Sequence, residues 1–249
     1  MKKVLYVLVA IIIVSCNSEN VPDCFQNSGA IVQQEFSVSD FTKITVFARV
    51  ELILKQEATQ NVVVETGEYL LNDIEVKVEN NRLLIINNNA CNLTRNYGIT
   101  KVYVSAPDIT EIRNASGLTV RSDGVLAYDN LTLVSEDFNA EDEVNNDGDF
   151  NVKVDCIKLD CVINNLSTIF ISGQVDDLCI GYYAGDARFE GRHLIAQNID
   201  IFQRSSNDMI INPQQSLTGE IRSTGDVISV STPPTVAVEQ FYTGQLIFE

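Results

Sequence analysis

Short runs of alternating apolar and polar residues cover much of the chain from residue 36 onward. Residues 50–54 and 74–78 place Val, Leu or Ile at every second position, and residues 83–86 form a further apolar run. A period of two is typical of β-strands with one buried face, so these runs predict strands. Asn80 and Asn81 separate the last two runs. Because Asn tolerates the left-handed backbone of a two-residue turn, this pair predicts a hairpin over 74–86.

One short pattern occurs twice near the middle of the chain. Val144-Asn145-Asn146 precedes Asp149-Phe150, and Ile163-Asn164-Asn165 precedes Ile169-Phe170, so the pattern returns after nineteen or twenty residues. A fixed period of about this length is typical of β-solenoids, in which each repeat is one coil stacked on the last. The repeat therefore predicts stacked coils.

Two interleaved series of β-rich segments continue this spacing toward the C-terminus. The first comprises 168–171, 187–190 and 209–211, and the second comprises 178–180, 199–201 and 217–221. Strands this short cannot bury a face alone, whereas stacked coils give each strand a neighbour on both sides. The sequence therefore predicts an all-β domain of stacked coils, with antiparallel or irregular strands near residues 36–104.

Several motifs, in this order, resemble one known family. They are Phe41–Val46, Ile74–Ile85, Pro107–Ile109 leading to Ser116-Gly117, Thr224–Val227 and Tyr242-x-Gly244. Together they resemble the putative autotransporter adhesin head GIN domain family, over residues 36–249. The resemblance implies a right-handed parallel β-helix in a lipidated or secreted protein of the Bacteroides type. It implies no enzymatic activity, because none is attached to the family.

The N-terminus has the organisation of a bacterial lipoprotein signal peptide. Lys2 and Lys3 precede an apolar run over 4–14 that is too short to span a bilayer, and Ser15-Cys16 then resembles a lipobox. We expect residues 1–15 to be removed and Cys16 to be lipidated, the alternatives being an ordinary signal peptide or an uncleaved anchor. Asn17 resembles the second residue of lipoproteins sorted to the outer membrane, with the surface or periplasmic orientation left open. Residues 16–35 are polar and predict a tether before the domain at 36–249.

Charge excludes one large class of partner. The 249 residues include 17 Lys and Arg against 34 Asp and Glu, a formal net charge of −17. Such a surface repels nucleic-acid phosphates and anionic lipid, so we expect no nucleic-acid binding. Membrane attachment would then depend on acyl chains at Cys16 rather than on charge.

The remaining cysteines are odd in number if Cys16 carries lipid, so at least one thiol stays free or pairs between molecules. Cys24 and Cys91 lie in polar, loop-like sequence and are predicted to form a disulfide. The other three, Cys156, Cys161 and Cys179, interrupt apolar strands and are predicted to be buried. A zinc site made by these three with His193 lacks the usual paired Cys spacing, so no metal or cofactor is expected.

The segment over 136–149 is dense enough in carboxylates to suggest a Ca²⁺ loop. With Gly148 at the invariant glycine position, the twelfth position falls on Val154, where an EF-hand needs Glu. A solvated acidic turn is the simpler interpretation, with weak binding of a cation as the alternative.

Polar and aromatic side chains offer two further ligand sites. Asn145, Asn146, Asn164 and Asn165 could contact sugars, but Asn side chains stacked at equivalent turns more simply bond along the coil axis. Four aromatic residues could form a carbohydrate platform or pack in the core: Tyr182, Tyr183, Phe202 and Tyr242.

The sequence offers few residues for catalysis: it contains a single His and no motif that would place a nucleophile beside it. We therefore expect a non-catalytic binding or adhesion module of the cell envelope, with a glycan or protein ligand. The alternative is a polysaccharide-processing enzyme that uses Asp200 and Asp208, whose carboxylates would have to converge across a groove.

Overall fold

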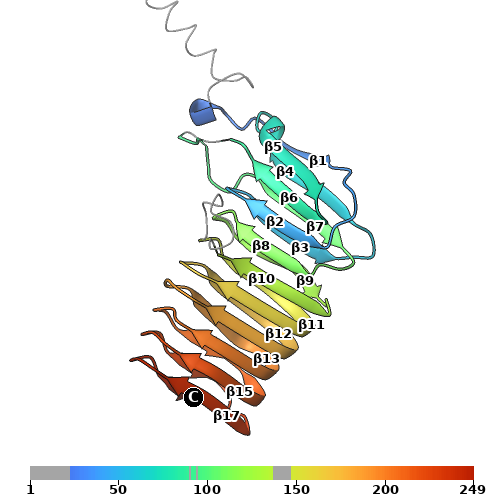
Figure 1. Ribbon diagram of the computed structural model, residues 1–249. Helices are drawn as coiled ribbons and strands as arrows, with labels where there is room; N and C mark the ends of the chain where they lie inside the picture. Colours follow the sequence, from blue (N-terminus) through green and yellow to red (C-terminus); the bar gives the residue numbers. More distant parts are fainter. Residues whose placement is uncertain (1–22, 90, 94, 137–146) are drawn as a thin grey trace, which may run out of the picture.

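The computed structural model describes residues 23–89, 91–93, 95–136 and 147–249 (Figure 1). These residues form one strongly curled mixed sheet of 18 strands, with two short 3-10 helices, η1 (Asp23–Phe25) and η2 (Leu71–Asp73), and no α-helix. The all-β class predicted from the sequence is confirmed. The strands are β1 (Ile31–Glu35), β2 (Lys43–Phe47), β3 (Glu51–Gln56), β4 (Asn61–Gly67), β5 (Ile74–Glu79), β6 (Arg82–Asn87), β7 (Lys101–Ala106), β8 (Glu111–Ala115), β9 (Val120–Leu126), β10 (Asn130–Ser135), β11 (Phe150–Ile163), β12 (Thr168–Tyr182), β13 (Arg188–Gln203), β14 (Met209–Ile211), β15 (Pro213–Ile221), β16 (Val227–Ser229), β17 (Thr235–Gln240) and β18 (Leu246–Phe248).

Parallel pairing arranges these strands in two columns. Column A contains β6, β2, β8, β10, the second halves of β11, β12 and β13, then β15 and β17. Column B contains β7, β3, β9, the first halves of β11, β12 and β13, then β14, β16 and β18. Figure 1 shows the successive strands stacked side by side from the green to the red end of the chain.

The register of the columns confirms the spacing read from the sequence. In column B, Phe150 pairs with Ile169, Ile169 with Phe189, and Phe189 with Met209. The two interleaved series of segments are therefore the two columns. From here on, one step along the columns to the parallel neighbour is called a coil.

Three strands are longer than the sequence predicts. β11, β12 and β13 contain 14, 15 and 16 residues, and each passes from column B into column A without a break. Pairing between coils continues through this bend, where Cys156 pairs with Val175 and Val175 with Ala196. The prediction of separate short strands is wrong here, because parallel neighbours maintain the strand conformation through the bend.

The N-terminal third mixes both strand orientations. The predicted hairpin over 74–86 is confirmed as β5 and β6, which pair antiparallel. Its turn residues Asn80 and Asn81 have φ of 50° and 64°, the left-handed values that a two-residue hairpin turn requires. β4 lies antiparallel to β7, while β2 and β3 already belong to the parallel columns.

The tether predicted over 16–35 is too long at its C-terminal end. Residues 31–35 form β1, which pairs antiparallel with β4 through five residue pairs. The sequence signal was weak because this strand is largely exposed and carries Gln33, Gln34 and Glu35. β1 is held by backbone hydrogen bonds at the sheet edge, which leave no apolar periodicity to detect.

The core lies inside the curl, where inward side chains align from coil to coil. Leu159, Leu178, Ile199 and Leu217 occupy one row in column A, and all four are buried. Burial of each such side chain contributes about 1.5 to 3 kcal/mol. Because every coil adds to the same rows, the core extends along the whole stack, and alternate side chains point outward.

Candidate binding surface

The outward face of column A carries a ladder of polar side chains joined from coil to coil. Asn198 Nδ2 donates to Asp177 Oδ1 (2.9 Å), and Ser216 Oγ donates to Asn198 Oδ1 (2.8 Å). In the next outward row, Thr218 Oγ1 donates to Asp200 Oδ1 (2.7 Å). These residues surround a shallow hollow of about 140 Å³. The face therefore presents amide, carboxylate and hydroxyl groups that hydrogen bonds between coils hold in place.

An aromatic and cationic column borders this ladder. The rings of Tyr183 and Phe202 stack with centroids 5.1 Å apart, and the guanidinium of Arg222 lies 5.8 Å from the Phe202 centroid and 4.1 Å from the Phe241 centroid. Arg222 also pairs with Glu220. Arg222 thus bridges the rings of neighbouring coils by cation–π contacts.

The structure divides the four aromatic residues proposed as a platform. Tyr182 is fully buried, which is the core alternative of the two left open by the sequence, and its hydroxyl donates to Arg188 O. Tyr183 and Tyr242 are exposed, and Phe202 is partly buried beneath Tyr183 and Arg222. Tyr182 points inward because it continues the alternation of Leu178 and Ile180. Arg222 and Phe241 were missed, although both follow the coil spacing from Phe202.

The Asn pairs have structural roles where the structure describes them. Asn164 is buried, and its Oδ1 accepts a hydrogen bond from Tyr183 N (3.1 Å) on the next coil. Asn165 has φ of 68°, which the turn after β11 requires. This supports bonding along the coil axis rather than sugar contact. Asn145 and Asn146 lie outside the described residues.

The carboxylates proposed for catalysis do not share a hollow. Asp200 lines the hollow on column A and accepts from Thr218. Asp208 lies in the turn before β14, where its Oδ1 accepts from Asp226 N (3.1 Å) and its Oδ2 lies 3.5 Å from Arg188 Nη1. The two residues fall on different parts of the coil, because Asp208 comes after the turn that leaves column A. Asp200 and Asp208 thus have separate hydrogen-bond partners in the described part of the chain.

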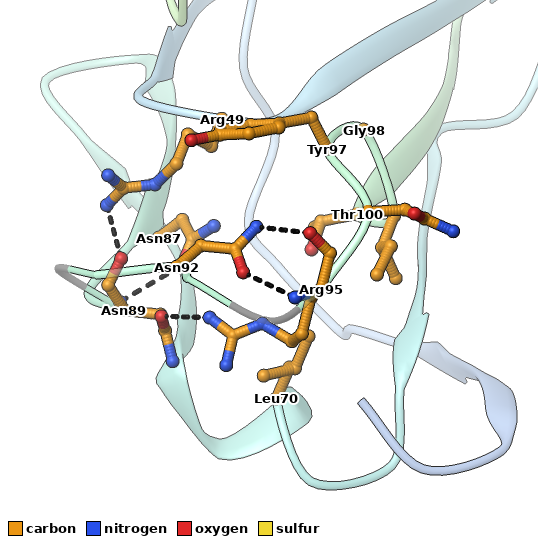
Figure 2. A pocket seen from close by; sticks show the side chains of 11 residues that line it. Arg49, Leu70, Asn87, Asn89, Asn92, Arg95, Tyr97, Gly98 and Thr100 are labelled. Carbon is orange, nitrogen blue, oxygen red and sulfur yellow. Dashed lines mark hydrogen bonds between the residues drawn. The ribbon is translucent and has the colours of Figure 1, made fainter. Parts of the chain in front are cut away.

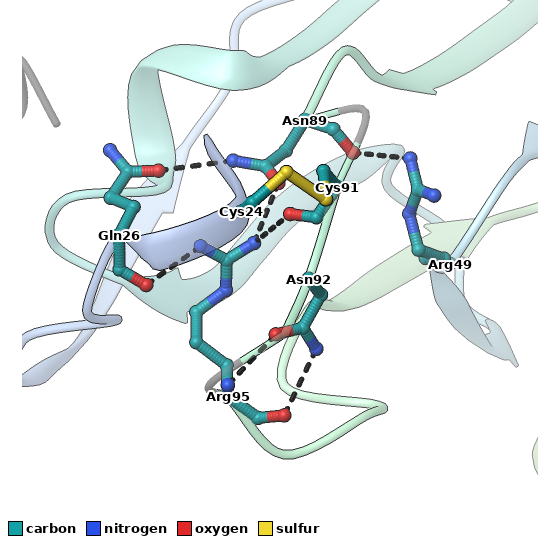
Figure 3. Close-up of a disulfide and its surroundings, with 7 residues drawn as sticks. All are labelled: Cys24, Gln26, Arg49, Asn89, Cys91, Asn92 and Arg95. Atoms are coloured by element: carbon teal, nitrogen blue, oxygen red, sulfur yellow. Dashed lines mark hydrogen bonds between the residues drawn. A yellow bond between two sulfur atoms is a disulfide. The ribbon is translucent and has the colours of Figure 1, made fainter. Parts of the chain in front are cut away.

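Cys24 and Cys91, the two cysteines that the sequence analysis pairs, form a disulfide with a Cα–Cα distance of 4.4 Å (Figure 3). The guanidinium of Arg95 lies beside it and donates to Gln26 O (2.8 Å), Cys91 O (2.9 Å) and Asn89 Oδ1 (2.6 Å). Backbone carbonyls from both sides of the crosslink therefore share one cation. The disulfide and Arg95 together fasten the segment at Cys24 to the loop after β6.

A small hollow of about 40 Å³ opens next to this crosslink, between Arg49, Asn92, Tyr97 and Thr100 (Figure 2). The guanidinium of Arg49 donates to Asn89 O, so it also binds the loop after β6. A volume of this size holds a few waters at most. We therefore assign the hollow to the structure of the loop rather than to a ligand.

The three other cysteines divide differently from the sequence prediction. Cys156 and Cys161 are buried as predicted, and burial raises the pKa of the Cys156 thiol to about 11. Cys179 is exposed on the outward face of column A, so the prediction of a buried residue is wrong. Leu178 and Ile180 take the inward positions on either side of it, which leaves Cys179 outward. The pKa of the Cys179 thiol is also raised, mainly because the thiol is partly desolvated and secondly because the charge of Asp160 lies nearby.

No cluster of three or more His, Cys, Asp or Glu side chains suited to a metal occurs among the described residues. Most of the acidic segment, 137–146, lies outside them. At its edges, the buried Glu136 pairs with Arg113 (3.1 Å) and Asp149 Oδ1 accepts from Thr168 N (2.8 Å). Both flanking carboxylates are thus bound within the fold.

The geometry defines a class of protein: an all-β protein whose strongly curled mixed sheet carries polar and aromatic side chains on its outward face. In the part of the chain that the structure describes, no helix is long and apolar enough to cross a membrane. The family model described as "Putative auto-transporter adhesin, head GIN domain" matches residues 40–233, and the chain belongs to this family.

Solved structures share the fold at low sequence identity. A putative adhesin from Bacteroides fragilis NCTC 9343 has a TM-score of 0.78 at 16% identity, covering 88% of this chain and 97% of its own. A putative adhesin from Parabacteroides merdae ATCC 43184 has a TM-score of 0.65 at 15% identity, covering 89% and 97%. A putative lipid binding protein from Parabacteroides distasonis ATCC 8503 has a TM-score of 0.65 at 14% identity, with the same coverage. No curated protein matches the chain.

Proposed function

We propose that the protein is a non-catalytic binding or adhesion module of the cell envelope that contacts its ligand through the outward side chains of the coils. The observation that carries this proposal is the column A ladder of Asp177, Asn198 and Ser216, with the aromatic column beside it. Pre-ordered polar groups and exposed rings suit recognition, because little side-chain freedom is lost on binding. Family membership supports the proposal, since the family and two of the three similar structures are described as putative adhesins.

We further infer that the two columns wind as a right-handed parallel β-helix after residue 101. From β11 onward, the parallel register at steps of 17 to 21 residues supports this, for example from Ala196 to Pro213 and from Ser172 to His193. Strand crossovers are right-handed in the great majority of parallel sheets. A crystal structure with a left-handed path from β11 to β12 would contradict it.

Binding without chemical change is the outcome that tests the proposed function. The purified protein should bind at least one ligand on an array of glycans and extracellular proteins, and mass spectrometry should find that ligand unaltered after incubation. Cleavage of a bound polysaccharide would show an enzyme instead. Absence of binding to every ligand would also count against the proposal.

The membrane anchor is proposed from the sequence, since Cys16 lies outside the described residues. Replacing Cys16 with Ala should abolish metabolic labelling by an acyl chain and move the protein to the soluble fraction, because each buried methylene contributes about 0.8 kcal/mol to membrane binding. Cell fractionation with immunoblotting measures this, and Cys179→Ala is the matched control. Retention of the Cys16→Ala protein in the membrane would refute lipidation. Protease treatment of whole cells would then distinguish a surface from a periplasmic orientation.

A further inference from the structure

A second and larger hollow lies on the outward face of column B. Its volume is about 330 Å³, and its polar and aromatic lining comprises Asn151, Phe170, Ser172, Glu190, Arg192 and His193. Pockets for small molecules span roughly 300 to 1,000 Å³, so this hollow is at the small end of that range. It contains the one His of the chain.

A β-bulge creates the polar edge of this hollow. Phe170 pairs with Glu190 and Ser172 with His193, so β13 has two residues, Gly191 and Arg192, opposite the single Ile171. The extra residue breaks the alternation, and the consecutive side chains of Arg192 and His193 both reach the outer surface. Bulges are frequent beside functional sites because they redirect a side chain in this way.

The aromatic part of the lining is Phe170, whose side chain is 45% exposed. In the same outward row, Asn151 lies on one neighbouring coil and Glu190 on the other. An apolar ring between an amide and a carboxylate suits a ligand with an apolar face and a hydroxylated edge. A pyranose ring has this form, with C–H groups on its face and hydroxyls around its rim.

The charges at the rim are balanced and held in place. Arg192 makes a two-point ion pair with Glu249, one of whose contacts measures 2.9 Å, and Glu190 pairs with Arg188 at 2.6 Å. Paired side chains lose little freedom when a ligand binds. Arg188, Glu190, Arg192 and Glu249 therefore have no net charge with which to attract an ionic ligand. The formal net charge of the whole chain, −17, repels anions.

We propose that the hollow on column B binds an uncharged pyranose unit, with its face against Phe170 and its hydroxyls bonded to Asn151, Glu190 and His193. The amide and imidazole can each donate and accept hydrogen bonds, and the carboxylate accepts. The inference rests on the proposed binding function and specifies a ligand class for it.

The single histidine makes the hollow directly observable. In the full chain, purified in detergent and labelled with ¹³C-histidine, one imidazole signal reports on His193. Methyl glycosides of glucose, galactose, mannose and N-acetylglucosamine are the neutral probes, and methyl glucuronoside is the anionic one. We expect at least one neutral glycoside to shift the signal saturably. Phe170→Ala should weaken that binding about tenfold, a loss of about 1.4 kcal/mol, because it removes the ring that the sugar face packs against.

Tyr97→Ala is the matched control, because Tyr97 is an exposed aromatic residue that lines the N-terminal hollow instead. This variant should bind as the unmodified protein does. The inference is overturned if no neutral glycoside shifts the signal, if only the glucuronoside does, or if Phe170→Ala binds unchanged. Binding to an array without any shift of the His193 signal would overturn this site while leaving the proposed function standing.

Discussion

Replacing Cys91 with Ser is expected to lower the free energy of unfolding by about 4 kcal/mol. The Cys24–Cys91 bond joins residues 67 positions apart, and a crosslink over a loop of this length restricts the unfolded chain strongly. Arg95 still donates to Gln26 O and Cys91 O in this variant, so the substitution removes the covalent link alone. Urea denaturation followed by circular dichroism would measure the change.

The appropriate comparison is the double substitution Cys24→Ser with Cys91→Ser, which leaves no unpaired partner to form a wrong disulfide. It should match Cys91→Ser and the reduced protein. Cys179→Ser should change the free energy of unfolding by at most about 0.5 kcal/mol, because Cys179 is exposed and outside the core. Equal stability of the double variant and the unmodified protein would show that the crosslink does not constrain the fold.

Replacing Gly173 with Ala should destabilise the protein by about 2 to 5 kcal/mol, for two separable reasons. Gly173 has φ of +116°, which L-residues rarely adopt. A Cβ at this position would also lie 1.9 Å from the carbonyl oxygen of Val154, its partner on the preceding coil. The backbone of Val154 in the preceding coil cannot move aside without breaking the pairing between β11 and β12.

Gly124→Ala separates the two effects. Gly124 has φ of +96°, but nothing lies within 4 Å of the position that its Cβ would occupy. This control should therefore show only the backbone strain, about 1 to 2 kcal/mol. If both variants lose the same stability by thermal or urea denaturation, close packing between coils at Gly173 is not what the position requires.

Periodicity made the architecture predictable from the sequence. Phe150 and Ile169, paired in the structure, already stood at matching places in the repeat, because stacked coils impose one spacing on every row. The hairpin turn at Asn80 was equally predictable from the sequence, since few residues tolerate its φ of 50°. Strand β1 could not be predicted from the sequence, because an edge strand held by backbone hydrogen bonds needs no apolar pattern.

The candidate surfaces were less predictable for a different reason. Cys179 was assigned to the core from the apolar character of its neighbours, but alternation within a strand decides which side a residue faces. Arg222 joins rings that lie about one coil away in each direction. The spacing of Phe202, Arg222 and Phe241 fits the repeat, but the sequence does not show which of these side chains face outward. The bulge at Arg192 depends on one extra residue between paired strands, and a single sequence gives no partner against which to count it.

The crosslink also determines how the molecule would carry mechanical load. If lipid at Cys16 holds the protein and a ligand pulls on the coils, tension enters at Cys24 and crosses to Cys91 through the disulfide. Residues 25–90, which include β1 to β6, then form a closed loop that the tension bypasses. The edge pairing of β1 with β4 is spared from peeling, and the force passes along the chain to β7, which lies between β3 and β4.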